Sequence, residues 1–309
     1  MSYSKVVVVG STNMDMVVNA SRIPSPGETI LAECFFMNPG GKGANQAVAV
    51  ARLGGEVTFV TKVGNDVFGH QSSLLFDDEG INTQYVFSDD ENPSGVALIT
   101  VDQKGENSIV VAPGANGFLF PHDFTENALA SLTRAEILLM QLEIPMDTVV
   151  FLAKYASASK IKVILNPAPM AKIPSELMKL LYLITPNETE AGHLSGTRIE
   201  NVEDAKKAAT KIAAQGAKNV IITLGSKGAL VLEAGIFHLV KTPKVKAVDT
   251  TAAGDVFNGA LAVALSENKS LKEAVEFACR ASAISVTRVG AQSSIPYRRE
   301  IITDQLDSI

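Results

Sequence analysis

Tryptophan is absent from this chain of 309 residues, and aromatic residues make up only 6% of it. Proteins that hold nucleic acids by stacking on the bases need aromatic side chains, so this absence disfavours them. Positive charge is also in short supply, because the formal net charge is -6 at pH 7. That balance argues against binding to phosphate backbones or anionic lipid surfaces. We therefore expect no nucleic-acid partner and no membrane partner, although a local positive cluster could still bind one small anion.

Cysteine is scarce as well, and long hydrophobic runs are missing. Cys34 and Cys279 lie far apart with no CxxC pair, which indicates neither a disulfide framework nor a zinc ribbon. No apolar run reaches the roughly 20 residues of a membrane helix, and "GALAVAL" ends at Ser266 and Glu267. The opening "MSYSKVVVVG" has too short an apolar run for a signal peptide and predicts a buried first strand. A cytoplasmic location is the expectation.

What the chain does contain is an alternation of short apolar runs and helical stretches from about Ala135 onward. The runs "EILLMQLE", "KVILNPAP", "LLYLITPNE" and "NVIITLGSKGALVL" each predict a strand, and residues 146–159 and 202–215 predict helices. Such β-branched runs are typical of parallel strands buried between helix layers. We expect an α/β fold with three α/β/α layers around a doubly wound, mostly parallel sheet. No linker divides the chain, so residues 1–309 are expected to form one domain.

The first third of the chain predicts a second, smaller sheet. Residues 29–37 ("TILAECFFM") and 94–114 ("SGVALITVDQKGENSIVVAPG") alternate like exposed strands, and "DQKGEN" has the glycine and the polarity of a hairpin turn. These strands would form a lid, from about residues 12–40 and 92–113, that projects from the main body. Its edges and faces need a cover, either a partner subunit or closure over a ligand.

Two familiar nucleotide-binding signatures are missing. Gly10 is followed by "STNMDM", which breaks the glycine spacing of a dinucleotide fingerprint. In "NPGGKGANQ", Lys42 is followed by Gly43 where a Walker loop has serine or threonine, and Phe36 stands where that loop has its first glycine. Any phosphate must therefore be bound in another way.

The stretch "DTTAAGDVFNGAL", residues 249–261, places Asp255 in the first turn of an expected helix. An acid there is stabilised by the helix dipole and often has no other role. However, the unpaired amides of Ala253, Gly254 and Asp255 could hold a phosphoryl group, since small side chains let an anion approach the backbone. Asp255 could then accept a proton from an attacking hydroxyl, although the dipole should lower its pKa, because phosphoryl transfer needs little early proton abstraction. The pattern favours a kinase over a hydrolase.

A second polar cluster is expected in "NPGGKGANQAVAVARLGG", residues 38–55. Lys42, Asn45 and Gln46 crowd the first turn of a predicted helix beside a glycine-rich loop. A simple turn into a helix would also explain this pattern. Asn13 and Asp15 share one side of the extended segment that leaves the first strand. Together these side chains suit a polyhydroxylated ligand.

Five motifs in order carry a resemblance that covers the chain from the first strand to about Arg299: "GGKGANQAVAVARLG", "TPNETEA", "TLGSKGA", "DTTAAGDVFNGAL" and "VTRVGAQSS". The chain resembles the ribokinase-like sugar kinase family, which also includes fructokinases, adenosine kinase and phosphofructokinases of the second type. The resemblance implies ATP-dependent phosphorylation of D-ribose at its primary hydroxyl, with 2-deoxyribose or another furanose, or a catalytically silent sugar sensor, as alternatives. It also implies a homodimer through the lid sheet.

The resemblance also implies roles for individual residues. The sugar would be held by Asn13, Asp15, Gly41, Lys42, Asn45 and Glu143. Asp255 would be the catalytic base, and the amides of Ala252, Ala253, Gly254 and Asp255 would form the anion hole. Asn187 and Glu190 would organise the phosphates and Mg²⁺ through water, and Thr223, Gly225, Ser226 and Gly228 would lie along ATP. Cys279 stands near the nucleotide where the family often has asparagine or histidine. A monovalent cation, usually K⁺, would be bound by Asp249 and Ser294 and by carbonyls of Thr251, Ser285, Arg288 and Gly290.

Each assignment has a structural alternative. Glu143 could cap a following helix, and Asn187 and Glu190 could be a helix cap and its box partner. Asp249 could form a turn. Cys279 could be a small core residue on an apolar helix face.

Overall fold

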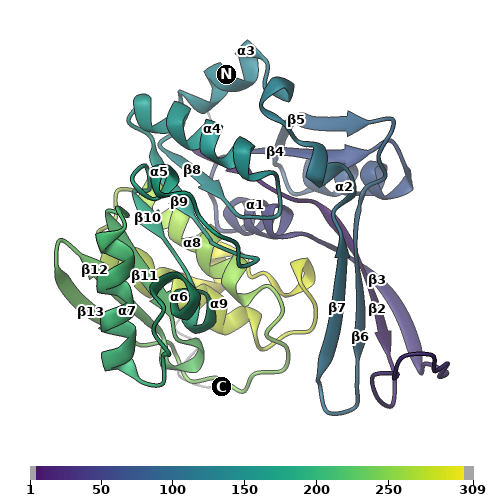
Figure 1. Ribbon diagram of the computed structural model, residues 1–309. Coiled ribbons are helices and arrows are strands. Elements are labelled where there is room, and N and C mark those ends of the chain that lie inside the picture. The colour runs from purple at the N-terminus through teal and green to yellow at the C-terminus, as the bar shows by residue number, and fades with distance from the viewer. Residues whose placement is uncertain (1–4, 303–309) are drawn as a thin grey trace.

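The computed structural model describes residues 5–302, and within that range nine strands form one large sheet (Figure 1). The order is β13-β12-β11-β10-β9-β8-β1-β4-β5. The bounds are β1 (Val6–Val9), β4 (Val57–Gly64), β5 (Asn82–Asp89), β8 (Ile137–Met140), β9 (Lys162–Leu165), β10 (Leu183–Ile184), β11 (Asn219–Thr223), β12 (Ala229–Glu233) and β13 (Ile236–Val240). All neighbours from β11 to β5 pair in parallel, and β12 and β13 add an antiparallel edge. The predicted sheet is thus confirmed as mostly parallel.

Helices cover both faces of this sheet. One face carries α1 (Lys42–Arg52), α2 (Val67–Asp78), α8 (Ala253–Ser266), α9 (Leu271–Ser285) and α10 (Arg298–Ile302), and the other carries α3 (Glu126–Leu132), α4 (Met146–Ala158), α5 (Ser175–Met178), α6 (Glu188–Ser195) and α7 (Val202–Ala214). Alternate residues of β1 divide between the two cores, since Val6 and Val8 pack with α1 and α8 while Val7 and Val9 pack with α4 and α7. A strand buried on both faces needs this continuous apolar run. The three layers are confirmed.

One strand prediction is wrong in its extent. The run "NVIITLGSKGALVL" is not a single strand, because it folds back as the antiparallel pair β11 and β12 around the short helix η3 (Gly225–Lys227). Gly225 and Gly228 have φ values of 56° and 98°, which reverse the chain there. Glycine adopts such values without the strain that a Cβ would bring.

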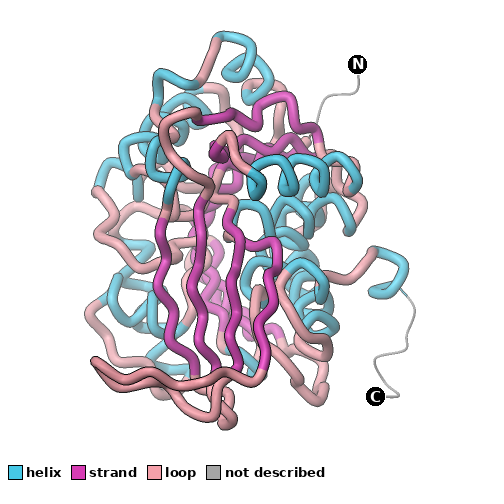
Figure 2. The backbone as a smooth tube through the Cα atoms, turned by 90° about the vertical axis from the view of Figure 1, so that its right-hand side faces the viewer, coloured by secondary structure: helices cyan, strands magenta, loops and turns pink. Residues whose placement is uncertain are grey.

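The second sheet has the order β3-β2-β6-β7 within the described residues and projects from the main body in Figure 1, while Figure 2 shows its strands face-on. Its strands are β2 (Asn13–Asn19), β3 (Cys34–Gly40), β6 (Gly95–Val101) and β7 (Asn107–Ala112). The predicted β6–β7 hairpin is confirmed. The strand expected at residues 29–37 instead begins at Cys34 and runs to Gly40, because pairing of Asn19 with Cys34 and of Asn13 with Gly40 sets its register.

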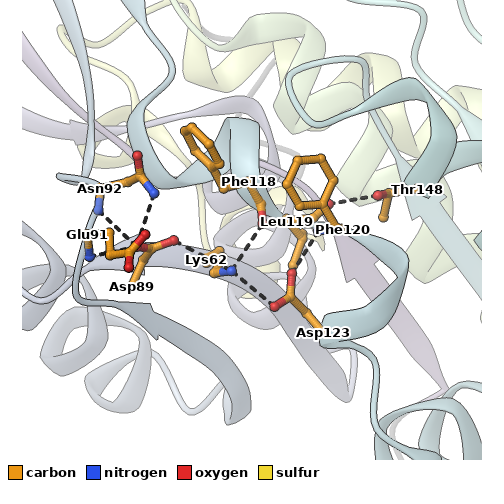
Figure 3. Close-up of polar contacts among 9 residues, drawn as sticks. All are labelled: Lys62, Asp89, Glu91, Asn92, Phe118, Leu119, Phe120, Asp123 and Thr148. Carbon is orange, nitrogen blue, oxygen red and sulfur yellow. Dashed lines mark hydrogen bonds and ion pairs between the residues drawn. The ribbon is translucent and has the colours of Figure 1, made fainter.

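Lys62 of β4, in the large sheet, contacts the two chain segments that lead into and out of the β6–β7 hairpin of the small sheet (Figure 3). Its Nζ atom lies 3.5 Å from Asp89 Oδ2 and 3.0 Å from Asp123 Oδ1, and it donates to the Phe118 carbonyl at 3.1 Å. Asp89 ends β5 and also accepts from the amide of Asn92, in the segment that leads into β6. Phe118 belongs to η1 (Gly114–Phe118) and Asp123 to η2 (Pro121–Asp123), and both short helices follow β7. One ammonium group therefore holds both connections of the β6–β7 hairpin.

Among the helices of residues 5–302, none is long and apolar enough to cross a membrane.

Candidate active site

Polar side chains follow three neighbouring strands of the large sheet directly after their last residues. Gln141 follows β8, Asn166 follows β9 and Thr185 follows β10, and all three are buried. The first turns of α1 lie over this edge, because Gln46 bonds to both Gln141 and Asn166. Ligands of open α/β sheets bind at the carboxyl ends of the strands. The functional site is therefore expected at this edge.

Asp255 lies in the first turn of α8 at the same edge. It is 8% exposed, and its carboxylate accepts hydrogen bonds from Asn45 Nδ2 at 3.0 Å and from Gln46 Nε2 at 2.9 Å. Burial raises the pKa of Asp255, and this effect outweighs Lys42, Asn45 and Gln46, which lower it. The expectation that the helix dipole would lower this pKa is wrong in direction, because removing water from a buried carboxylate favours its neutral form.

The N-terminus of α8 offers backbone donors beside that carboxylate. Ala252 precedes the helix in the left-handed region, with φ 59°, a conformation that costs a non-glycine residue roughly 1–2 kcal/mol. The Ala253 amide donates to the Thr250 carbonyl at 3.2 Å, so this member of the expected anion hole is already engaged. Gly254 has open space where a Cβ would project. An anion can therefore approach the backbone closely at Gly254 and Asp255.

A cavity of about 180 Å³ opens onto this turn. Its lining includes Lys42, Asn187, Glu190, Thr223, Gly254 and Asp255. Burial lowers the pKa of Lys42, but the carboxylates of Asp255, Glu143 and Glu190 together raise it above its usual value. A charged ammonium group beside a helix N-terminus is suited to bind a phosphoryl group.

Asn187 and Glu190 begin α6 as a capping box. Asn187 Oδ1 accepts from the Glu190 amide at 2.8 Å, and Glu190 Oε2 accepts from the Asn187 amide at 2.9 Å. The structural alternative for this pair is thus confirmed. Both residues also line the cavity, and burial raises the pKa of Glu190. Capping and ligand binding can use the same two side chains here.

A second cavity of about 340 Å³ shares Asn187, Thr223, Ala253 and Gly254 with the first. It is also lined by Gly225, Gly228 and Cys279. Ser226 is exposed on η3 and does not line this cavity. Cys279 is 4% exposed, and burial raises the pKa of its thiol to about 12, so it is a neutral core residue at the cavity wall.

Lys42 and Glu143 form an ion pair next to the first cavity. Lys42 Nζ lies 3.6 Å from Glu143 Oε1, and the Lys42 amide donates to Glu143 Oε2 at 3.1 Å. The Ser11 hydroxyl donates to the same carboxylate oxygen. Glu143 therefore does not cap the helix that follows it, since it bonds to the first amide of α1, far away in the sequence. Gly41 precedes that amide as the N-cap of α1.

Asn13 and Asp15 complete this cluster from the start of β2. Asn13 is buried, and its Oδ1 accepts from Asn116 Nδ2 at 2.8 Å. Burial and the charge of Glu143 raise the pKa of Asp15 to about 7, an effect that Lys42 only partly offsets. The charges of Lys42 and Glu143 therefore shift the pKa of Asp15, and Asn45 bonds to Asp255. Four of the residues expected to hold the sugar thus lie close together. A cluster of amides, acids and one ammonium group can hydrogen-bond several hydroxyl groups.

Asp249 connects the loop before α8 with the segment around Gly290 that follows α9. It accepts from the Thr251 amide at 2.9 Å, from the Thr251 hydroxyl at 2.6 Å and from the Gly290 amide at 2.8 Å. The turn-forming role is confirmed, and these hydrogen bonds outweigh burial and lower the pKa of Asp249.

The other residues expected at a cation lie nearby in the sequence. Ser294 is buried, but its hydroxyl donates to the Ala291 carbonyl. Ser285 and Arg288 lie in the same stretch at the end of α9. Within residues 5–302, no group of three or more His, Cys, Asp or Glu side chains could hold a metal ion.

Four buried polar residues at this edge have no role in the sequence-based predictions: Gln141, Asn166, Thr185 and Asn258. A signal for the first three does exist, because each is the first polar residue after a short buried strand. Parallel strands bring such positions to one edge, so the pattern could have identified them. Asn258 carries no comparable signal, since it lies inside the α8 pattern.

Comparison with known proteins agrees with this geometry. The family model described as pfkB family carbohydrate kinase matches residues 4–298. A ribokinase from Haemophilus influenzae is 44% identical over 295 residues, which cover 96% of this chain and 96% of that protein. A deoxyribokinase from Salmonella typhi is 36% identical over 292 residues, which cover 94% of this chain and 95% of that protein.

The fold comparison leads to the same family. The structure of Arabidopsis thaliana ribokinase complexed with ribose and ATP matches with a TM-score of 0.92 and 36% identity, and covers 100% of both chains. The resemblance inferred from the five motifs is therefore confirmed. This chain belongs to the pfkB family of carbohydrate kinases.

Proposed function

We propose that this carbohydrate kinase transfers the γ-phosphoryl group of ATP to the primary (5-) hydroxyl of D-ribose and forms ribose 5-phosphate. The observation that carries the proposal is the position of Asp255, whose buried carboxylate lies beside a helix N-terminus in a cavity that Lys42 also lines. Similarity to a ribokinase that was solved with ribose and ATP supports the choice of both substrates.

Asp255 is the proposed base. The hydroxyl oxygen bonds to the γ-phosphorus while the bond from that phosphorus to its bridging oxygen breaks, and ADP leaves with the electron pair. Asp255 accepts the hydroxyl proton, which its raised pKa favours. The amides at positions 252–255 stabilise the migrating phosphoryl group, with Gly254 and Asp255 as the main donors because the Ala253 amide is engaged.

The sugar is proposed to lie among the side chains of the Lys42–Glu143 cluster. Asn13, Asp15, Gly41, Lys42, Asn45 and Glu143 would contact it. Asn45 supports this assignment because it bonds to Asp255 and so links the cluster to the base. ATP would occupy the adjoining cavity, along Thr223, Gly225, Gly228, Gly254 and Cys279, with Ser226 at its exposed rim.

Two cations are part of the proposal. In the described part of the chain, no group of three or more acidic, His or Cys side chains could hold a metal ion, which fits Mg²⁺ carried mainly by ATP phosphates, with Asn187 and Glu190 acting through water. Bound there, Mg²⁺ would neutralise phosphate charge. A monovalent cation, K⁺ in our proposal, would be held by Asp249 and Ser294 and by the carbonyls of Thr251, Ser285, Arg288 and Gly290. A single carboxylate among backbone oxygens fits one positive charge, and the cation would stiffen the loop before α8.

The small sheet is proposed as the lid, comprising residues 12–40 and 92–113, within one domain of residues 1–309, of which 1–4 and 303–309 lie outside the described range. Closure would exclude water and so prevent wasteful hydrolysis of ATP. The lid also carries exposed apolar side chains: Phe35, Met37, Leu98, Ile109, Val110 and Val111. Exposed apolar surface of this kind supports a homodimer through the lid. A cytoplasmic location stays a prediction.

One alternative substrate is supported by an observation. The similarity to a deoxyribokinase keeps 2-deoxyribose open, along with other furanoses. Asp15 favours ribose, because this partly buried carboxylate would be left without its hydroxyl partner, at a cost on the order of 1–3 kcal/mol. A silent sugar sensor is disfavoured, since Asp255, Gly254 and Glu190 line one cavity.

A substrate panel tests the proposal. ADP release would be followed by a coupled assay with ribose, 2-deoxyribose, fructose and adenosine, each with and without K⁺. We expect the highest kcat/KM with ribose and a gain on adding K⁺. Higher kcat/KM with any other sugar would reject ribose as the substrate, and no ADP release with any sugar would reject the transfer reaction.

Asp255→Asn tests the assigned base. Turnover should fall by about 100-fold or more, because an amide cannot accept the proton and general bases contribute about 10²–10⁴-fold. Sugar binding, measured by calorimetry, should weaken far less than turnover. Unchanged turnover would show that another group accepts the proton.

A further inference from the structure

Buried side-chain amides form a chain of hydrogen bonds that ends at the Asp255 carboxylate. Gln46 is 0% exposed, and its Nε2 donates both to Asp255 Oδ1 at 2.9 Å and to Asn166 Oδ1 at 3.1 Å. Its Oε1 accepts from Gln141 Nε2 at 2.6 Å, and Gln141 is also 0% exposed. A glutamine amide has one acceptor end and one donor end. Since Gln141 donates to the acceptor end of Gln46, the donor end must face the carboxylate.

A second branch of the same chain reaches the first turn of α8. Asn166 Nδ2 donates to the Thr185 carbonyl at 3.4 Å, and the Thr185 hydroxyl donates to Asn258 Oδ1 at 2.6 Å. Asn258 Nδ2 then donates to the Gly254 carbonyl at 2.8 Å. The chain therefore ends at the two neighbouring residues of α8 that the transfer reaction uses, Gly254 and Asp255. Each hydrogen bond of such a buried network restricts the side chains that it joins, although Gln141 Oε1 and Asn45 Oδ1 have no hydrogen-bond partner within residues 5–302.

The carboxylate of Asp255 has different neighbours on its two oxygens. Asn45 Nδ2 bonds to Oδ2, and Asn45 is also one of the residues assigned to the sugar. Gln46 bonds to Oδ1. Its remaining side-chain hydrogen bonds are made to Asn166 and Gln141 at the strand ends, and none is made to a residue assigned to the sugar. If a bound sugar draws the Asn45 amide away from Oδ2, the Gln46 hydrogen bond to Oδ1 still holds the carboxylate.

We propose that Gln46 is a positioning residue of the transfer reaction, which aims the Asp255 carboxylate at the attacking hydroxyl and is itself oriented by Gln141. The inference rests on the proposed role of Asp255 as the base. Removing the Gln46 donor should lower kcat with little change in the KM for the sugar.

The pH dependence of kcat gives a readout that a merely structural role would not move. Charged groups that influence Asp255 come from several elements: Lys42 of α1, Glu143 after β8, Asp15 of β2 and Glu190 of α6. None of them changes when Gln46 is replaced. Gln46 lowers the pKa of Asp255, so its loss raises that pKa further. Because the base must be ionised to accept a proton, the acidic limb of kcat should move to higher pH.

The experiment compares Gln46→Met, Gln141→Met and a surface control, Gln71→Met on α2, where the side chain is exposed. Methionine keeps the length of glutamine and lacks its donors. We expect kcat of Gln46→Met to fall about 10- to 100-fold, as for loss of one hydrogen bond to a charged group. Gln141→Met should show a smaller fall, with the acidic limb displaced in the same direction, and Gln71→Met should match the unaltered protein. Thermal unfolding and calorimetric ADP binding report whether each variant is folded.

A double variant separates this inference from the proposed function. In the Asp255→Asn background, Gln46→Met should cause no further loss of turnover, since Gln46 acts through Asp255. If Asp255→Asn alone leaves turnover intact, the proposed base is wrong and the inference fails with it. If Asp255→Asn is inactive but Gln46→Met keeps kcat and its acidic limb, the inference alone is overturned. Should Gln46→Met not fold, Gln141→Met decides, and an unmoved acidic limb there also overturns the inference.

Discussion

At Gly254 the requirements of the fold and of the reaction can be separated. A Cβ at this position would meet no other atom within 4 Å, so it would project into the cavity space. Gly254→Ala should leave the free energy of unfolding unchanged or raise it by about 0.5–1 kcal/mol, because alanine is the better helix former. Turnover should fall strongly, since the methyl group would keep the phosphoryl group from the amides. Urea unfolding and the ADP-release assay measure the two effects, and full activity in a folded variant would contradict the proposed anion hole.

Asp15, one of the residues proposed to bind the sugar, should make the free energy of unfolding depend on pH. Burial, together with the charge of Glu143, raises its pKa from the ordinary value of 3.8 to about 7 in the fold. A raised carboxyl pKa favours the folded state below the unfolded pKa, and this contribution is lost as pH rises toward 7. Without sugar, Asp15→Asn should therefore gain stability relative to the unaltered protein by on the order of 4 kcal/mol between pH 4 and pH 8. Chemical unfolding across that range tests the sign. A difference that does not change with pH would contradict the prediction.

Lys62 governs how the β6–β7 hairpin is attached to the large sheet. The side chains of Lys62, Asp89 and Asp123 are only 13%, 9% and 16% exposed. Lys62→Met should lower the free energy of unfolding by about 3 kcal/mol or more, because it leaves two nearly buried carboxylates without their cation. The KM for the sugar should rise, since the hairpin is less firmly placed.

The control for Lys62 is Lys154→Met. Lys154 and Glu176 form a pair whose side chains are 54% and 56% exposed. An exposed pair contributes about 0–1 kcal/mol, so this variant should change stability little. Equal losses in both variants would show that the buried junction has no special role.

Elements that could be predicted from the sequence are those whose pattern depends on burial alone. The four valines of β1 require apolar neighbours on both faces, and the turn around Gly105 divides β6 from β7. The start of β3 at Cys34 could not be predicted, because pairing with β2 sets it and residues 30–32, outside the strand, are as apolar as residues 35–37 within it. Gln141 and Asn166 could have been found from their place after a strand. The direction of the Asp255 pKa could not, since it depends on how completely packing removes water.

The exposed apolar face of the small sheet matters for the whole molecule. Val110 on β7 is 64% exposed, so a change there alters the surface and not the core. If two copies associate through this sheet, Val110→Lys should shift the protein toward monomer, because charges facing each other across the interface repel. Leu74→Lys on α2, where leucine is 66% exposed, is the matched control. Sedimentation velocity measures both, and a monomeric unaltered protein at assay concentration would contradict the proposed dimer.

Residues 10–12 alone separate β1, in the middle of the large sheet, from β2 of the small one. Asn13 and Asp15 therefore belong to the small sheet, and they would move with it if it closes as the proposed lid. The same closing movement would then bring these two residues to the sugar and exclude water from the phosphates. With sugar recognition and closure coupled in this way, a sugar that lacks the hydroxyl proposed to meet Asp15 would lose a contact and would also leave the phosphates open to water for longer. The yield of phosphorylated sugar per ATP consumed should accordingly fall for poor substrates, and not only the speed of their conversion.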